Sequence, residues 1–154
     1  MATKSNLALA VCGSVDELEE ILANDYPQAD CPVVHRFTPG LYIRETHIPA
    51  GTMGTSMEHK TEHPFVITKG RVRVVSTTEG SVIYEAPYTG ITKPGTRRIL
   101  FAEADTVWTT FHPTQETELD KIAAEILEPH VNPLLEDELR NQWRLANPQQ
   151  PLIP

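Results

Sequence analysis

The sequence predicts a mainly β fold, an antiparallel sandwich or barrel with helices at both ends of the chain. Residues 33–112 contain eight short runs rich in valine, isoleucine, threonine and tyrosine, and turn pairs such as Pro39-Gly40 and Lys69-Gly70 separate them. Strands at this spacing are typical of antiparallel sheets rather than of βαβ units. The expected strands are Val33–Phe37, Leu41–Ile48, Met53–His59, His63–Thr68, Arg71–Thr77, Val82–Ala86, Arg97–Phe101 and Thr106–His112.

Size and composition indicate one folded domain over residues 1–154. A chain of 154 residues can bury a core of its own, and 40% apolar against 22% charged residues is typical of a globular protein. Thirteen basic and twenty-one acidic residues give a formal charge of −8. This charge argues against general nucleic-acid binding and against a polybasic membrane patch, since both require an excess of positive charge.

The first thirty-two residues are predicted to form an N-terminal helical arm. Ser14 and Glu17 are spaced as a capping box, in which each side chain satisfies a free backbone N–H group at the start of a helix. Leu18 and Leu22 then lie on one helical face, and Pro27 ends the segment.

The N-terminus also bears on the compartment. The apolar run Leu7–Cys12 is shorter than a membrane span of about 20 residues and than the core of a signal peptide. Cys12 and Cys31 could form one disulfide, but free thiols are the expectation in a chain without a secretion signal. We therefore expect the protein in the cytoplasm.

Residues 113–154 are predicted to form C-terminal helices and an extended tail. An apolar stripe that includes Leu119, Ile122 and Ile126 predicts one helix, which Pro129 closes. A second helix is expected over Pro133–Leu145, and the proline- and glutamine-rich tail spans Ala146–Pro154. Helical ends and a tail of this kind are typical of docking arms, so we expect a homo-oligomer, a dimer or larger.

A histidine pair is the most informative feature of the β region. Met57 and His59 share one face of an expected strand, and His63 shares a face of the next strand with Phe65 and Ile67. If both faces point inward, the two imidazoles meet in the interior, where they could begin a divalent transition-metal site. A helical His-x3-His pair is the alternative, but a proline and β-rich runs flank the pair.

The spacing Gly51-x5-Met57-x-His59-x3-His63-x6-Gly70 resembles the first motif of the cupin superfamily, written G-x5-H-x-H-x3,4-E-x6-G. The segment 93–98 resembles the second cupin motif, in which a proline–glycine turn leads into a strand with the last metal-binding histidine. This resemblance over residues 33–112 implies an antiparallel cupin jelly-roll barrel. The layout is most similar to small cupins found in bacteriophage genomes.

The metal ligands of that motif are only partly present. Carried over position by position, Met57 replaces the first histidine, His59 matches the second, His63 replaces the glutamate and Arg98 replaces the last histidine. A guanidinium stays protonated and cannot ligate a metal. The usual four-ligand cupin site therefore cannot form from these positions.

A variant metal site needs a third protein ligand besides His59 and His63. Glu58 and Glu62 are direct neighbours of His59 and His63, so in regular strands their side chains point to the opposite face from the two histidines. His112 is the best candidate, because it ends a strand that we expect to pair with Arg97–Phe101. The metal would be zinc, iron, manganese or nickel; the alternative is a pair of hydrogen-bonded histidines in a polar interior.

Arg98, Met57 and Trp108 are the candidate ligand-binding residues. Arg97 and Arg98 point to opposite faces of a strand, and an inward Arg98 would suit a carboxylate or phosphate. The sequence favours the alternative that Arg98 is paired with an acidic neighbour such as Glu45 or Glu103, since proteins supply partners to buried arginines. A tryptophan placed on a strand as Trp108 is belongs more often to a core or an interface than to a ligand platform.

Two classes of function remain open. The sequence contains neither a Gly-x-Ser-x-Gly elbow nor a phosphate-binding glycine loop. It favours a phage-type oligomeric cupin with a degenerate metal site, a structural or accessory binding module located in the host cytoplasm or a virion, with virion proteins as further partners. The alternative is a metal-dependent cupin enzyme of the dioxygenase, isomerase or lyase type that acts on a small acidic molecule. Whether the protein is an enzyme stays open, and the sequence leans against it.

Overall fold

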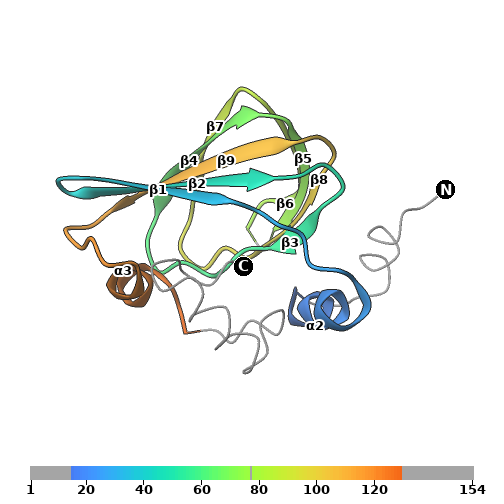
Figure 1. Cartoon of the computed structure of the whole chain (residues 1–154), viewed down its shortest axis with the longest axis horizontal. Helices are drawn as coiled ribbons and strands as arrows, with labels where there is room; N and C mark the ends of the chain where they lie inside the picture. Colours follow the sequence, from blue (N-terminus) through green and yellow to red (C-terminus); the bar gives the residue numbers. More distant parts are fainter. Residues whose placement is uncertain (1–14, 77, 130–154) are drawn as a thin grey trace.

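A computed structural model describes residues 15–76 and 78–129, which form nine strands and two helices (Figure 1). All strand pairs in the described residues are antiparallel. The elements are α2 (Val15–Asp25), β1 (Val33–Thr38), β2 (Leu41–Ile48), β3 (Met53–Thr55), β4 (His63–Lys69), β5 (Arg71–Ser76), β6 (Gly80–Glu85), β7 (Tyr88–Thr92), β8 (Arg98–Ala102), β9 (Thr106–Pro113) and α3 (Leu119–Ile126).

The strands form two sheets that face each other. One sheet has five strands in the order β1-β2-β9-β4-β7, and the other has four in the order β3-β8-β5-β6. Alternate residues of β4 are buried, so Phe65 and Ile67 point into the space between the sheets. They pack there against Val72 of β5, Tyr84 of β6 and Trp108 of β9. The mainly β fold with two antiparallel sheets is therefore confirmed.

The expectation of a closed barrel is wrong. No strand pairing joins the two sheets among the described strands. The edge strand β3 has only three residues, because the chain leaves the sheet after Thr55 instead of continuing as a strand to His59. A strand this short offers few backbone groups for pairing with another sheet. The molecule is accordingly a sandwich whose sheets remain separate.

The two described helices lie on the same side of the sheets (Figure 1). In α2, Leu18 and Leu22 are buried and pack against Met53 and Ile99 of the four-stranded sheet. In α3, Ile122 and Ile126 pack against Tyr42 of the five-stranded sheet. Neither helix is long and apolar enough to cross a membrane. The expected helix at Pro133–Leu145, the tail Ala146–Pro154 and Cys12 lie outside the described residues, and Cys31 is a free thiol.

Strand β7 is an element that the sequence did not predict. Pro87 and Gly90 interrupt the apolar pattern there, and both residue types are depleted in strands. The structure explains the glycine, since a Cβ atom at Gly90 would lie 2.5 Å from Cζ of Phe65. Gly90 thus lets the Phe65 ring lie directly against the backbone of the neighbouring strand.

Candidate metal centre between the two sheets

His59, His63 and His112 come together at one end of the space between the sheets. His63 begins β4 and His112 lies near the end of β9. Phe65 of β4 is paired with Thr110 of β9. His63 precedes Phe65 by two residues and His112 follows Thr110 by two, so both imidazoles lie on the inner face of adjacent strands. His112 joins the other two histidines, as expected, but the expected pairing of its strand with Arg97–Phe101 is wrong. Strand β9 pairs with β2 and β4, whereas β8 belongs to the other sheet.

His59 reaches the group from a loop rather than from a strand. The backbone around it is fixed on two sides, by an isolated β-bridge to Leu127 directly after α3 and by a hydrogen bond from the Gly95 N–H group to the His59 carbonyl at 3.0 Å. The Lys60 N–H group also donates to the Ile126 carbonyl at 2.8 Å. The loop is therefore anchored to α3, and its histidine is held against the end of β4.

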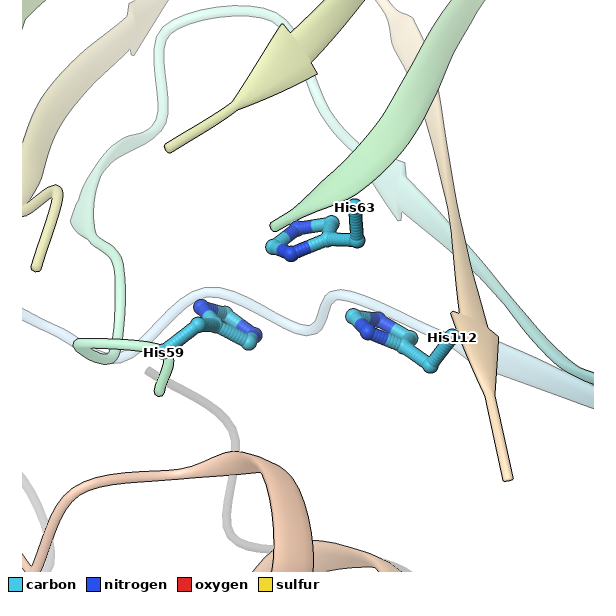
Figure 2. A group of neighbouring side chains, drawn as sticks. All are labelled: His59, His63 and His112. Carbon is cyan, nitrogen blue, oxygen red and sulfur yellow. The ribbon is translucent and has the colours of Figure 1, made fainter. Parts of the chain in front are cut away.

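The three rings surround one common space (Figure 2). Ring centroids lie 4.5 Å apart for His59 and His63, 4.4 Å for His63 and His112, and 5.4 Å for His59 and His112. One ligating nitrogen from each residue lies within 4.8 Å of the other two. His63 and His112 are almost completely buried, and His59 is half-buried.

Backbone carbonyl groups fix which nitrogen is protonated in two of the histidines. Nδ1 of His59 lies 3.1 Å from the Met57 carbonyl oxygen, and Nδ1 of His63 lies 3.2 Å from the Thr61 carbonyl oxygen. A carbonyl oxygen only accepts hydrogen bonds, so each Nδ1 carries the proton and donates. The lone pair of each neutral ring is then on Nε2, which is the atom available to a metal.

His112 has the opposite arrangement. Its Nε2 lies 2.8 Å from the Thr110 hydroxyl oxygen, whereas its Nδ1 is buried without any hydrogen-bond partner among the described residues. Buried polar atoms nearly always have a partner, so an unsatisfied ring nitrogen beside two free lone pairs requires an explanation. When Nε2–H donates to Thr110, the Nδ1 lone pair is free, and a metal ion would satisfy it.

Burial keeps all three imidazoles neutral at physiological pH. Desolvation is the main cause that lowers the pKa of His59 to about 3 and that of His112 to about 2, and the electrostatic interaction with the nearby His63 imidazole lowers both further. The pKa of His63 is lowered chiefly by burial as well. Neutral imidazole is the form that ligates a metal, so no proton has to be displaced at neutral pH.

The donor set fits a divalent transition metal. An ion about 2.1 Å from each nitrogen places the three nitrogens about 3.4 Å apart in tetrahedral geometry. The three candidate nitrogens lie within 4.8 Å of one another, an upper limit that includes this spacing. Three histidines leave further coordination positions for a water molecule or a substrate oxygen. Glu58 and Glu62 are not members of this group, in agreement with their predicted parity.

The histidines line a cavity of about 430 Å³ between the sheets, α2 and α3. All three predicted ligand-binding residues, Arg98, Met57 and Trp108, line it. Trp108 also belongs to the core, where its ring stacks on Phe65 with centroids 4.8 Å apart.

The expected ion pair of Arg98 with Glu45 or Glu103 does not form. Glu45 instead pairs with Arg36 and His47, and Glu103 pairs with Arg71 and Arg73. Neither glutamate is therefore the partner of Arg98. The Arg98 side chain points inward, and the residue is 5% exposed. The two arginines point to opposite sides, as strand alternation predicts. Arg98 points into the cavity, and the adjacent Arg97 binds Asp16 and Glu19 of α2.

The sequence reasoning missed Arg44, a second arginine that lines the cavity. The signal was available in the alternation of β2, because Tyr42, Thr46 and Ile48 are its buried residues and Arg44 shares their face. A charged residue on the apolar face of a strand is the feature that could have identified it. Burial lowers the pKa of its guanidinium, which nevertheless stays protonated at any working pH.

No protein-family model and no curated protein match the sequence. Solved structures that are similar to the chain include cupin proteins of three bacteria. A cupin-2 domain containing protein of Shewanella frigidimarina has a TM-score of 0.44 and 10% identity, covering 58% of this chain and 85% of its own. A cupin superfamily protein of Desulfitobacterium hafniense has a TM-score of 0.48 and 5% identity, covering 58% and 82%. A cupin domain from Bordetella pertussis has a TM-score of 0.45 and 16% identity, covering 57% and 97%.

Proposed function

We propose that this chain binds one divalent transition metal through His59, His63 and His112 and uses it on a small molecule in the adjoining cavity. The observation that carries the proposal is the hydrogen-bonding pattern of the three rings. It leaves one lone pair on each histidine, and the ligating nitrogens lie within 4.8 Å of one another. A merely structural histidine pair would leave the unsatisfied Nδ1 atom of His112 without an explanation.

The surrounding residues support the proposed site in two ways. The carbonyl groups of Met57 and Thr61 and the hydroxyl group of Thr110 orient the three rings, and such partners of metal-binding histidines also raise their basicity. A metal held by three histidines polarises an oxygen atom of a bound molecule or lowers the pKa of a bound water. Trp108 lines the cavity and also packs on Phe65 in the core.

We therefore favour a metal-dependent enzyme of the dioxygenase, isomerase or lyase type over the assembly role that the sequence alone favoured. The assembly role depends on the helical ends of the chain and on the tail Ala146–Pro154, which lies outside the described residues. It stays a prediction together with the phage association. Light scattering on the full chain and on a chain that ends at Leu145 tests it, because a docking tail predicts a smaller particle after truncation.

Metal titration of the chelator-treated full chain tests the proposed function. Cobalt(II) is the probe, since its visible absorption reports both stoichiometry and coordination geometry. We expect one ion per chain, and we expect His59→Ala, His63→Ala and His112→Ala each to remove tight binding. His47→Ala is the matched control, because this histidine is half-exposed and pairs with Glu45 away from the cavity. Binding that survives in the triple variant, or no stoichiometric binding in the native chain, would refute the proposal.

A further inference from the structure

Two arginines from different sheets line the cavity. Arg44 lies on β2 of the five-stranded sheet, and Arg98 lies on β8 of the four-stranded sheet. Both line the same cavity of about 430 Å³ as the three histidines. The Arg98 side chain starts on the four-stranded sheet, and its guanidinium lies over the Phe65 and Trp108 rings of the five-stranded sheet.

Neither guanidinium has a carboxylate partner within the described part of the chain. Nη1 of Arg98 donates to the Thr92 hydroxyl at 3.0 Å, and Nη1 of Arg44 donates to the Thr46 hydroxyl at 2.7 Å. The buried Nε of Arg98 has no hydrogen-bond partner there at all. The other described arginines do form ion pairs with acidic side chains: Arg36, Arg71, Arg73 and Arg97.

The unpaired state is notable in a chain with twenty-one acidic and thirteen basic residues. Carboxylates are abundant, yet no described aspartate or glutamate lines the cavity. Burying a guanidinium without a counter-charge is strongly unfavourable, and proteins normally supply a partner of their own. Arg98 is buried, with an unsatisfied N–H donor, and Arg44 is half-buried beside it in the same cavity. Together they indicate that the counter-charge comes from a ligand.

Both arginines belong to the same cavity lining as the three histidines. With the imidazoles neutral, the described lining of the cavity carries the two positive charges and no negative one. An anion bound between the arginines would therefore also lie beside the histidines.

We infer that the cavity binds a small organic dicarboxylate, with one carboxylate held by Arg98 and the other by Arg44. The planar guanidinium fork matches a carboxylate through paired hydrogen bonds, and Arg98 offers its free Nε–H group for such a pair. Two guanidinium groups that line one cavity without carboxylate partners suit a ligand with two anionic groups. Ile48, Leu100 and Ile122 provide apolar lining that would accommodate a hydrocarbon chain.

This assignment rests on the proposed function in one respect, since it takes the same cavity as the ligand site, but it does not require the metal. A bound dicarboxylate would also lower the repulsion between a divalent ion and the two guanidinium groups. Metal and dicarboxylate should then each raise the affinity of the other by the same factor, because coupling between two binding sites is reciprocal.

Calorimetric titration of the metal-free full chain, with the chelator removed by dialysis, is the first test. The probes are malonate, succinate, glutarate and adipate at constant ionic strength, with acetate and inorganic phosphate for comparison. We expect at least one dicarboxylate to bind about ten-fold more tightly than acetate and phosphate, which corresponds to one additional charge-assisted contact. Arg44→Met and Arg98→Met should each remove this preference. Arg36→Met is the matched control and should retain it, because Arg36 forms an exposed ion pair with Glu45.

The outcomes separate the two proposals. Equal affinity for acetate and dicarboxylates, tighter binding of phosphate, or unchanged binding by both cavity variants would overturn the dicarboxylate assignment, whatever the metal does. A dicarboxylate preference without any cobalt(II) binding would support the assignment and refute the metal site. Where both bind, the dicarboxylate should raise cobalt(II) affinity in the native chain and not in Arg98→Met, even though free dicarboxylates compete weakly for the ion in solution.

Discussion

Arg97 and Arg98 are neighbours in the sequence and should respond to the same substitution with opposite signs. Arg97 points away from the cavity and donates to the fully buried Glu19 at 2.8 Å and to Asp16 at 3.1 Å. Arg98 points into the cavity and is 5% exposed, with no carboxylate partner among the described residues. Methionine keeps an unbranched, largely apolar side chain in place of the aliphatic part of arginine and removes the charge.

The structure sets the expected size of each effect. Arg97→Met leaves Glu19 without this counter-charge, and breaking a buried pair in this way costs about 3–5 kcal/mol. Apolar replacement of buried ion pairs is often neutral or stabilising by about 1–4 kcal/mol, and replacing Arg98 leaves no buried carboxylate unpaired among the described residues. Arg98 lies over the Phe65 ring at 5.1 Å and the Trp108 ring at 5.7 Å, and these cation–π contacts offset part of its desolvation. We therefore expect Arg98→Met to raise the free energy of unfolding by about 1–2 kcal/mol.

Urea unfolding followed by circular dichroism measures both effects, in a buffer without carboxylates and after removal of metal. An unchanged m-value shows that the midpoint shifts report stability alone. Succinate or another bound dicarboxylate should then stabilise the native chain and not Arg98→Met, since a ligand stabilises only the protein that binds it. A loss of stability in Arg98→Met comparable with that in Arg97→Met would refute the reasoning, because it would show that Arg98 stabilises the fold.

Two further predictions concern the buried imidazoles and the unexpected strand. Because unfolded histidine titrates near pH 6.5 and the folded pKa values of His59 and His112 are about 3 and about 2, the unfolded chain binds more protons below pH 6.5. The free energy of unfolding of the metal-free protein should therefore fall by about 3 kcal/mol between pH 7.5 and pH 5.5 from these two groups. Urea titrations across this range measure the slope, and the double variant to asparagine should flatten it; an equal slope in both would contradict the assignment. Gly90→Ala should lower the free energy of unfolding by about 1–3 kcal/mol, since the new Cβ would lie 2.5 Å from the Phe65 ring. Gly54→Ala is its control, with 3.9 Å to the nearest side-chain atom, and equal thermal shifts for the two would argue against the close approach.

Local alternation predicted the faces of the strands but not how the sheets are completed. His63, Phe65 and Ile67 share the buried face of β4, as a two-residue period requires. The same two-residue period predicted a strand as far as His59, whereas β3 ends at Thr55. No local feature of the sequence marks the residue at which a strand leaves its sheet. That departure depends on contacts with Leu127 and Gly95, which are far away in the sequence.

The three histidines could be selected from the sequence, but the reasons that bring them together could not. His112 was chosen through a pairing of β9 with β8, whereas the two strands belong to different sheets. Charge partners are equally non-local. Glu45 and Glu103 were acceptable partners for Arg98 by composition, but each is engaged by other basic side chains on its own sheet. Which carboxylate reaches a buried arginine is decided by sheet topology, and strand periodicity carries no information about that.

A net negative charge does not prevent a cavity from binding an anion. The exposed carboxylates and the two cavity arginines act over different distances. Carboxylates such as those of Glu62 and Glu85 are exposed to solvent. Salt screens the electrostatic field of such groups beyond about 10 Å at 0.1 M ionic strength. Inside the cavity, a carboxylate 4 Å from a guanidinium gains about 4 kcal/mol at an effective dielectric constant near 20. Contact with Arg44 and Arg98 therefore outweighs the net charge of −8 for a molecule small enough to enter. A large polyanion meets only the acidic exterior, so the charge that argues against nucleic acid as a ligand also favours selection of small acids by size.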